Sequence, residues 1–168
     1  MNGAILLLAF VTAERLAELI LARRNTAALL AQGAFEAAPG HYPAIVAMHA
    51  LWLASLWYFG WDQPLVSIWL AIFLVLQVLR LWTLATLGRR WTTRIVILPN
   101  SSLVTSGPYR LMSHPNYLVV VGEIAVLPLA LGLPWIALVF SIANAIILSI
   151  RIRAENAALT GLRHVDQD

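Results

Sequence analysis

The chain has 168 residues, of which 61% are hydrophobic and only 11% are charged, and it carries seven tryptophans. Soluble domains of this size rarely have such a composition, so the sequence predicts an integral membrane protein. The net charge of +3 comes from arginine alone, because lysine is absent, and we attribute it to membrane topology rather than to nucleic-acid binding. The absence of cysteine excludes disulfides, thiolate metal sites and cysteine nucleophiles.

Five apolar segments are predicted to be membrane helices. In chain order they cover about residues 4–22, 44–61, 65–87, 117–131 and 134–150. The first apolar run has no basic residues before it, so we expect a retained span rather than a cleaved signal peptide. Tight turns join the second segment to the third and the fourth to the fifth, which predicts two helical hairpins after the first helix. With no internal repeat, residues 1–168 are predicted to form a single all-α membrane domain.

The arginines predict how these helices are oriented. All those outside the spans fall on one side of the five-span arrangement, at Arg23, Arg24, Arg89, Arg90, Arg94, Arg110, Arg151, Arg153 and Arg163. Basic residues favour the cytoplasmic side, so we expect the N-terminus outside and the C-terminus in the cytoplasm. The polar segments 25–43, 88–116 and 151–168 should then lie together at the cytoplasmic face.

Several polar side chains lie inside the predicted spans, all in the half nearer the cytoplasm: Glu14, Arg15, Glu18, Gln77, Arg80 and Glu123. Ionisable groups at such depth are costly unless they pair with one another or face a wet cavity. One interpretation is an ion-pair network that fixes the helices together. The other applies above all to Glu123, which lies two helical turns beyond Asn116, roughly 10 Å deep, and is predicted to line a site.

The stretch "GPYRLMSHPNYL" at residues 107–118 interrupts the apolar pattern. Each proline disfavours helix at the residue before it, and the backbone groups freed in this way must find partners. His114 could bind a carboxylate or a metal or shuttle a proton, although a single interfacial histidine is more often structural. Tyr109 and Tyr117 could equally be interfacial anchors, and Arg110 could simply mark the cytoplasmic edge of the membrane.

Motifs of soluble cofactor sites are missing from the sequence. No two glycines are separated by one residue, which excludes a G-x-G dinucleotide turn, and neither a P-loop nor a G-x-S-x-G elbow occurs. The four histidines include no i, i+3 or i, i+4 pair, so no metal site is predicted.

"GPYRLMSHPNYL", followed by Glu123 and by "RIRAENAAL" at residues 151–159, resembles the signature of the isoprenylcysteine carboxyl methyltransferase family. That family carries a GPYR, RHPxY and terminal EE pattern, which implies an S-adenosyl-L-methionine site at about residues 87–160. Here Ser113 replaces the arginine of RHP, and Asn156 replaces the second glutamate. "LGRRWTTRIVILP" is similar to the family's approach to this site. "AERLAELILARRN" and "QGAFEAAPGHYPAIVAMH" resemble a short bacterial branch of alkylpyrone and alkylresorcinol O-methyltransferases.

The resemblance implies a set of cofactor-binding candidates: Tyr109, Arg110, His114, Pro115, Asn116, Tyr117, Arg151, Arg153, Glu155 and Asn156. A carboxylate acceptor is already ionised at neutral pH and needs no base, whereas a phenolic hydroxyl, with a pKa near about 10, would benefit from one. The catalytic candidates are Glu36, His41, His49 and Glu123.

From these features we expect an S-adenosylmethionine-dependent methyltransferase in the bacterial inner membrane, with its active site facing the cytoplasm. It should methylate an oxygen of a lipidic acceptor, either a carboxylate or a phenol or enol hydroxyl. Its partners would be this acceptor and membrane lipid, without nucleic acid. Two alternatives are a membrane NADPH-dependent reductase of a lipid and a non-enzymatic binding or transport protein.

Overall fold

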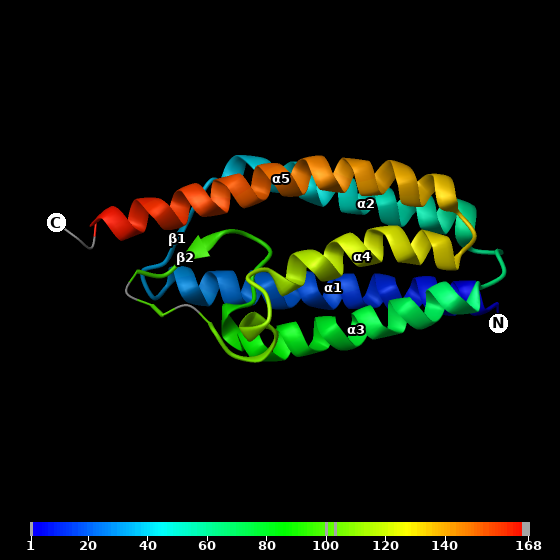
Figure 1. Cartoon of the computed structure of the whole chain (residues 1–168), viewed down its shortest axis with the longest axis horizontal. Coiled ribbons are helices and arrows are strands. Elements are labelled where there is room, and N and C mark those ends of the chain that lie inside the picture. Colours follow the sequence, from blue (N-terminus) through cyan, green and yellow to red (C-terminus); the bar gives the residue numbers. More distant parts are fainter. Residues whose placement is uncertain (1, 100, 103, 166–168) are drawn as a thin grey trace.

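The protein folds into an elongated bundle whose helices run along its long axis (Figure 1). The structure is a computed structural model that describes residues 2–99, 101–102 and 104–165, with side chains as far as Glu155 except that of His41. The helices are α1 (Gly3–Leu30), α2 (Tyr42–Gly60), α3 (Ser67–Leu87), α4 (Pro115–Ala130) and α5 (Pro134–Val165). The predicted all-α fold with five helices is thereby confirmed.

Three of the described helices are long and apolar enough to cross a membrane, namely α2, α3 and the part of α5 up to Glu155. α4 is apolar but shorter, and α1 carries charged residues near its middle. The expectation that α1 and α4 also cross the membrane stays a prediction, as does the orientation of the bundle.

Two helices are longer than the hydrophobic pattern predicted. α1 continues from the expected end near residue 22 to Leu30, and α5 continues from about residue 150 to Val165. Alanine, leucine and arginine dominate both extensions and all favour helix, so the helix persists where the apolar run ends. These extensions project from one end of the bundle, where the C-terminus also lies (Figure 1).

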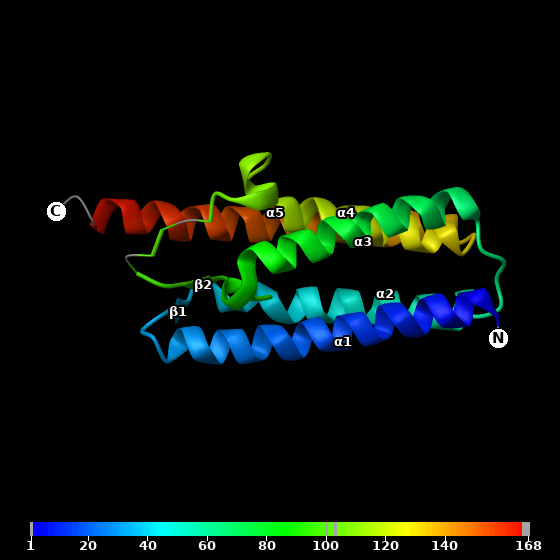
Figure 2. The same ribbon diagram turned by 90° about the horizontal axis from the view of Figure 1, so that it is seen from below.

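The core is built from apolar side chains of all the helices, and Leu8, Trp52, Phe73 and Leu127 are each at most 2% exposed. α4 packs mainly between α3 and α5. Gly122 allows the close approach of α4 to α3, since a Cβ there would lie 2.8 Å from Leu76 Cδ1. Viewed from below, α1 and α2 form one layer, and α4 and α5 lie in the other (Figure 2).

The polar segments gather at one end of the bundle, as predicted (Figure 1). They form a two-strand ribbon of β1 (Phe35–Glu36) and β2 (Val96–Ile97), which pair antiparallel, and three 3₁₀ turns, η1 (Pro39–His41), η2 (Gly88–Arg90) and η3 (Gly107–Arg110). The short ribbon was not predicted. Asn25 of α1 fixes the start of the long connection after α3, because its amide nitrogen donates to the carbonyl oxygens of Gly88 and Trp91, at 3.1 and 2.9 Å.

Candidate active site

A cavity of about 290 Å³ lies between α1, α2, α4 and α5 near the polar end of the bundle. Its polar lining comprises Thr12, Arg15, Glu18, Tyr42, His49, Arg80, Thr92, Thr93, Asn116, Tyr117, Asn144 and Arg151. Its remaining lining is largely aliphatic and includes Leu16 of α1 and Val46 of α2, which are 57% and 43% exposed. Because both side chains also face the outside, the cavity opens between α1 and α2 onto the apolar surface of the bundle.

A buried ion-pair network forms the deep polar side of this cavity. Arg80 donates through Nη1 to both carboxylate oxygens of Glu18, each at 2.8 Å, and through Nε to Glu123 Oε1 at 2.8 Å. A further bond joins Arg80 Nη2 to Glu123 Oε2. Arg80 and Glu123 are each only 2% exposed, so their charges stabilise one another away from water.

Arg15 and Gln77 complete the network. Arg15 donates to Glu18 Oε2 at 3.1 Å and to Glu123 Oε2 at 2.7 Å, and Gln77 donates to Glu123 Oε1 at 2.8 Å. The Glu123 carboxylate is thus held by three side chains and is not part of the cavity wall. Its catalytic role stays a prediction, and these contacts favour the alternative in which it ties α1, α3 and α4 together.

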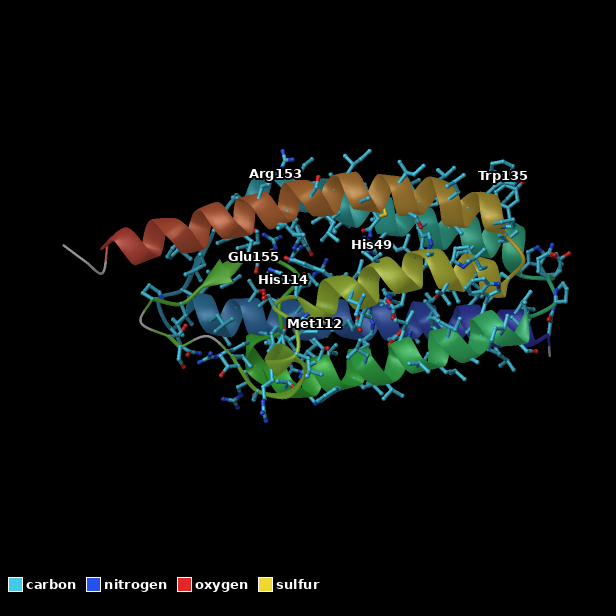
Figure 3. All side chains as sticks on the ribbon, viewed as in Figure 1. His49, Met112, His114, Trp135, Arg153 and Glu155 are labelled. Atoms are coloured by element: carbon cyan, nitrogen blue, oxygen red, sulfur yellow. The ribbon has the colours of Figure 1, made fainter. Side chains whose placement is uncertain are left out.

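Five of the predicted cofactor residues come together where α4 begins and α5 leaves the bundle, and we call Tyr109, His114, Tyr117, Arg151 and Glu155 the motif cluster. The rings of His114 and Tyr117 are stacked, with centroids 4.9 Å apart and planes 16° from parallel. The Tyr117 hydroxyl donates to Glu155 and accepts from Arg151 Nε at 3.1 Å. Figure 3 shows His114 and Glu155 next to each other at this end of the bundle.

Tyr109 stays protonated in this setting. Burial raises its pKa to about 12, and the negative charge of Glu155 adds to the shift. Its neighbour Gly107 fixes the turn that carries it, since Gly107 has a φ of +57° and a Cβ there would lie 2.4 Å from Thr86 Oγ1 of α3. Only glycine fits such a backbone against such a neighbour without strain. The GPYR motif is therefore packed onto α3.

Among the described residues that line the cavity, four have a buried polar side-chain atom without a hydrogen-bond partner: Arg15 Nε, Trp52 Nε1, Trp91 Nε1 and Asn116 Oδ1. Buried donors and acceptors left open in this way cost free energy unless a bound group pairs with them. Asn116 follows Pro115 in the first turn of α4, so its amide oxygen and the indole nitrogen of Trp91 give the cavity an open acceptor and an open donor near the family motif.

His49 lines the cavity from α2, farther toward the middle of the bundle than His114 and Glu155 (Figure 3). Its Nδ1 lies 2.8 Å from the carbonyl oxygen of Ile45. A carbonyl can only accept, so Nδ1 carries a hydrogen and, in the neutral ring, Nε2 keeps a lone pair. Nε2 is therefore the nitrogen of His49 that can accept a proton.

Other predicted residues lie away from the cavity. Glu36 pairs with Arg94 at 2.7 Å in the two-strand ribbon. Arg110 is exposed on η3, and Arg153 points away from the bundle (Figure 3). The side chains of His41 and Asn156 lie outside the described residues. None of these assignments is tested by the contacts, and all stay predictions.

Several lining residues were not predicted. Trp91, Thr92 and Thr93 line the cavity within "RRWTTR", the stretch after α3. Tyr42 donates or accepts a 3.1 Å bond with Thr93 Oγ1, and Asn144 is a 4%-exposed amide in the apolar part of α5. Asn144 could have been predicted from the sequence, because a single asparagine in an apolar span often has a functional role. The place of Trp91 could not, because it depends on the contact of Asn25 with the chain after α3.

Among the side chains that the structure describes, no three His, Asp or Glu residues lie close enough together to hold a metal ion. The motif cluster instead offers aromatic rings, a carboxylate and a guanidinium. Groups of this kind suit an organic cofactor with amino, hydroxyl and aromatic parts.

The model of the isoprenylcysteine carboxyl methyltransferase (ICMT) family matches residues 69–161. The chain is also 42% identical over 159 residues to YpbQ, an uncharacterized protein of Bacillus subtilis (strain 168), in a match that covers 92% of this chain and 95% of that relative. No solved structure matches the chain. The residues matched by the family model include the whole motif cluster, Arg80 and Glu123, whereas α1 and α2 with His49 lie outside them.

Proposed function

Because the chain belongs to the isoprenylcysteine carboxyl methyltransferase family, we propose that it transfers a methyl group from S-adenosyl-L-methionine to an oxygen of a lipidic acceptor. The observation that carries this proposal is a shared cavity. Asn116, Tyr117 and Arg151 of the family motifs line it on one side, and His49 lines it on another. A methyl donor and an acceptor can be held face to face only where their two sites meet in this way.

The residues present fit the cofactor. The open carbonyl of Asn116 and the open indole N–H of Trp91 provide one acceptor and one donor at the cavity wall. Glu155 offers a carboxylate for an amino group or ribose hydroxyls, and the stacked rings of His114 and Tyr117 offer a flat aromatic face. When bound, S-adenosylmethionine supplies an electrophilic methyl group on a sulfonium centre.

The acceptor is proposed to be lipidic because the cavity opens onto the apolar surface between Leu16 and Val46. Its aliphatic wall suits a hydrocarbon chain. An acceptor dissolved in the membrane can enter this opening without crossing water. Positioning it beside the motif cluster is then the main catalytic task of α1 and α2.

Among possible acceptor oxygens, a phenol or enol hydroxyl fits the polar lining better than a carboxylate does. Arg15 and Arg80 are already paired with Glu18 and Glu123, and Arg151 donates to the Tyr117 hydroxyl and the Thr93 carbonyl, so each arginine on the lining is already engaged by groups of the protein. His49, in contrast, has an open Nε2 that can accept the proton of a hydroxyl as the oxygen becomes nucleophilic. His49 is therefore the general base of the proposed reaction.

The proposal is tested by binding and by turnover. Purified protein titrated with S-adenosylhomocysteine and, in parallel, with NADPH should bind the first and not the second. Incubating it in lipid nanodiscs with methyl-labelled cofactor and a bacterial lipid extract should then label a lipid. Binding of NADPH without binding of S-adenosylhomocysteine would instead favour a reductase. Binding of neither would favour a transport or binding protein.

The motif cluster is proposed to face the cytoplasm, where S-adenosylmethionine is made. The exposed arginines at that end of the bundle support this orientation, since basic residues favour the cytoplasmic side. In a bacterium the protein would then lie in the inner membrane.

A further inference from the structure

A second cavity, of about 670 Å³, lies at the polar end between the last turns of α1, η2 and the chain just after β2. It shares no lining residue with the candidate active site. Asn25 lines this second cavity and bonds to Trp91, which lines the first. The two cavities therefore lie on either side of one contact between α1 and the connection after α3.

The second cavity is strongly basic. Arg24, Arg89 and Arg90 line it, and no Asp or Glu does. Within the described part of the chain, none of these arginines forms a salt bridge with a carboxylate. Arg90 is held in place by a 2.5 Å bond from Nη1 to the carbonyl oxygen of Ser102. Guanidinium groups gathered in this way bind phosphate well, because each presents a planar set of donors that matches its oxygens.

The same cavity has an apolar side, to which Leu21, Leu29 and Leu98 contribute. Leu21 is 39% exposed, and Ala17, one helical turn earlier on the same face of α1, is exposed as well, so this side continues into the outer apolar surface of α1. Along α1, Leu21 is followed by Arg24 toward the polar end, at the boundary between the apolar and polar parts of the bundle. This order matches the first acyl carbons and the headgroup phosphate of a phospholipid. Free phosphate would use only the arginines.

We propose that this second cavity binds the headgroup phosphate of an anionic phospholipid, with the start of its acyl chains against Leu21. The local charge selects anionic over zwitterionic lipid, because each basic residue near a membrane surface contributes about 1 kcal/mol of attraction to an anionic one. The bound lipid lies against Asn25, the α1 residue whose hydrogen bond positions Trp91. This site is independent of the methyl transfer proposed above, and its test requires no turnover.

The test measures lipid retention by the full chain in detergent, by native mass spectrometry, after addition of phosphatidylglycerol or of phosphatidylcholine with the same acyl chains. We expect selective retention of phosphatidylglycerol. The variant Arg24→Gln should weaken it about fivefold, the loss that corresponds to one basic contact. The variant Arg24→Gln/Arg89→Gln should weaken it further.

Arg23→Gln is the matched control, because it removes the same charge from the neighbouring position of α1, where the side chain is exposed and outside the cavity. It should retain phosphatidylglycerol as the unmodified chain does. Equal retention of the two lipids, or equal losses in Arg23→Gln and Arg24→Gln, would overturn the site. Displacement of phosphatidylglycerol by inorganic phosphate at equal concentration would overturn its assignment to a lipid, whereas failure of phosphate to compete supports it.

Discussion

Arg80 of α3 and Glu123 of α4 form a doubly hydrogen-bonded ion pair inside the bundle, and each residue is 2% exposed. Arg80 also holds Glu18 of α1. One guanidinium thus joins three helices around the deep side of the candidate active site.

Glu123→Gln should destabilise the protein by about 3–5 kcal/mol, because it leaves the buried charge of Arg80 without part of its compensation. Thermal unfolding in detergent measures the effect. Glu36→Gln removes a carboxylate from the exposed pair with Arg94 and should cost about 0–1 kcal/mol. A Glu123→Gln protein with unchanged stability and lost turnover would instead establish the catalytic role predicted from the sequence.

His49→Gln should reduce turnover of a hydroxyl acceptor by about 10²–10⁴-fold, because it removes a general base. The affinity for S-adenosylhomocysteine should be unchanged, since His49 is on α2 and lies apart from His114 and Glu155 (Figure 3). The measurement compares the methylation rate of the His49→Gln protein with that of the unmodified chain at saturating S-adenosylmethionine. If His49→Gln kept full turnover and Glu36→Gln lost it, the general base would be Glu36 in the two-strand ribbon and not His49.

His114→Ala should weaken binding of S-adenosylhomocysteine without unfolding the protein, because it removes one ring of the stack with Tyr117. Isothermal titration measures the affinity. The counterpart is Arg153→Gln, which alters a residue that points away from the bundle and should bind as the unmodified chain does. Weakened binding in Arg153→Gln with unchanged binding in His114→Ala would show that the cofactor lies on the outer side of α5.

Gly107→Ala should destabilise the protein and weaken cofactor binding. It adds a Cβ at a φ of +57° and within 2.4 Å of Thr86 Oγ1. Gly33→Ala separates the two causes, because Gly33 has a φ of +91° and nothing within 4 Å of the added Cβ. The backbone cost of about 1–2 kcal/mol should appear in both variants. The loss of cofactor affinity should appear in Gly107→Ala alone, and equal affinities would contradict the packing role of Gly107.

Single cysteines test the orientation directly, since the chain contains none of its own. Asp62 lies in the connection between α2 and α3, Ser102 lies in the connection after β2, and both are exposed. These two connections are at opposite ends of the bundle (Figure 1). In intact bacteria, a membrane-impermeant maleimide should label Asp62→Cys and leave Ser102→Cys unlabelled until the membrane is opened. The reverse pattern would place the motif cluster outside the cytoplasm.

The sequence was sufficient to predict the five helices, although not the full lengths of α1 and α5. The spacing of Gln77 and Arg80 predicted that both lie on one face of α3, and an ion-pair network was one of the two interpretations of the charges within the helices. The contact of Glu123 with this face was not predicted, because counting residues along α4 gives its level but not its partner. The motif residues His114, Tyr117 and Glu155 were found together because a family pattern connected them.

Other features depend on contacts that no local pattern encodes. The pairing of Glu36 with Arg94 requires two strands of two residues each, too short for an alternating pattern. The place of Trp91 on the cavity wall depends on Asn25, which lies in a different part of the chain. Such long-range contacts are set by the packing of the whole bundle and not by the period of any helix.

The opening between Leu16 and Val46 has a kinetic consequence. For a substrate that enters from the bilayer, the concentration that determines the rate is its concentration within the membrane. Adding lipid at a fixed amount of substrate lowers that concentration. The apparent KM for the acceptor should therefore scale with mole fraction in nanodiscs or micelles, and not with bulk molarity. The same opening lets membrane partitioning act as a first filter, retaining molecules with long hydrocarbon tails before any side chain of the protein selects among them.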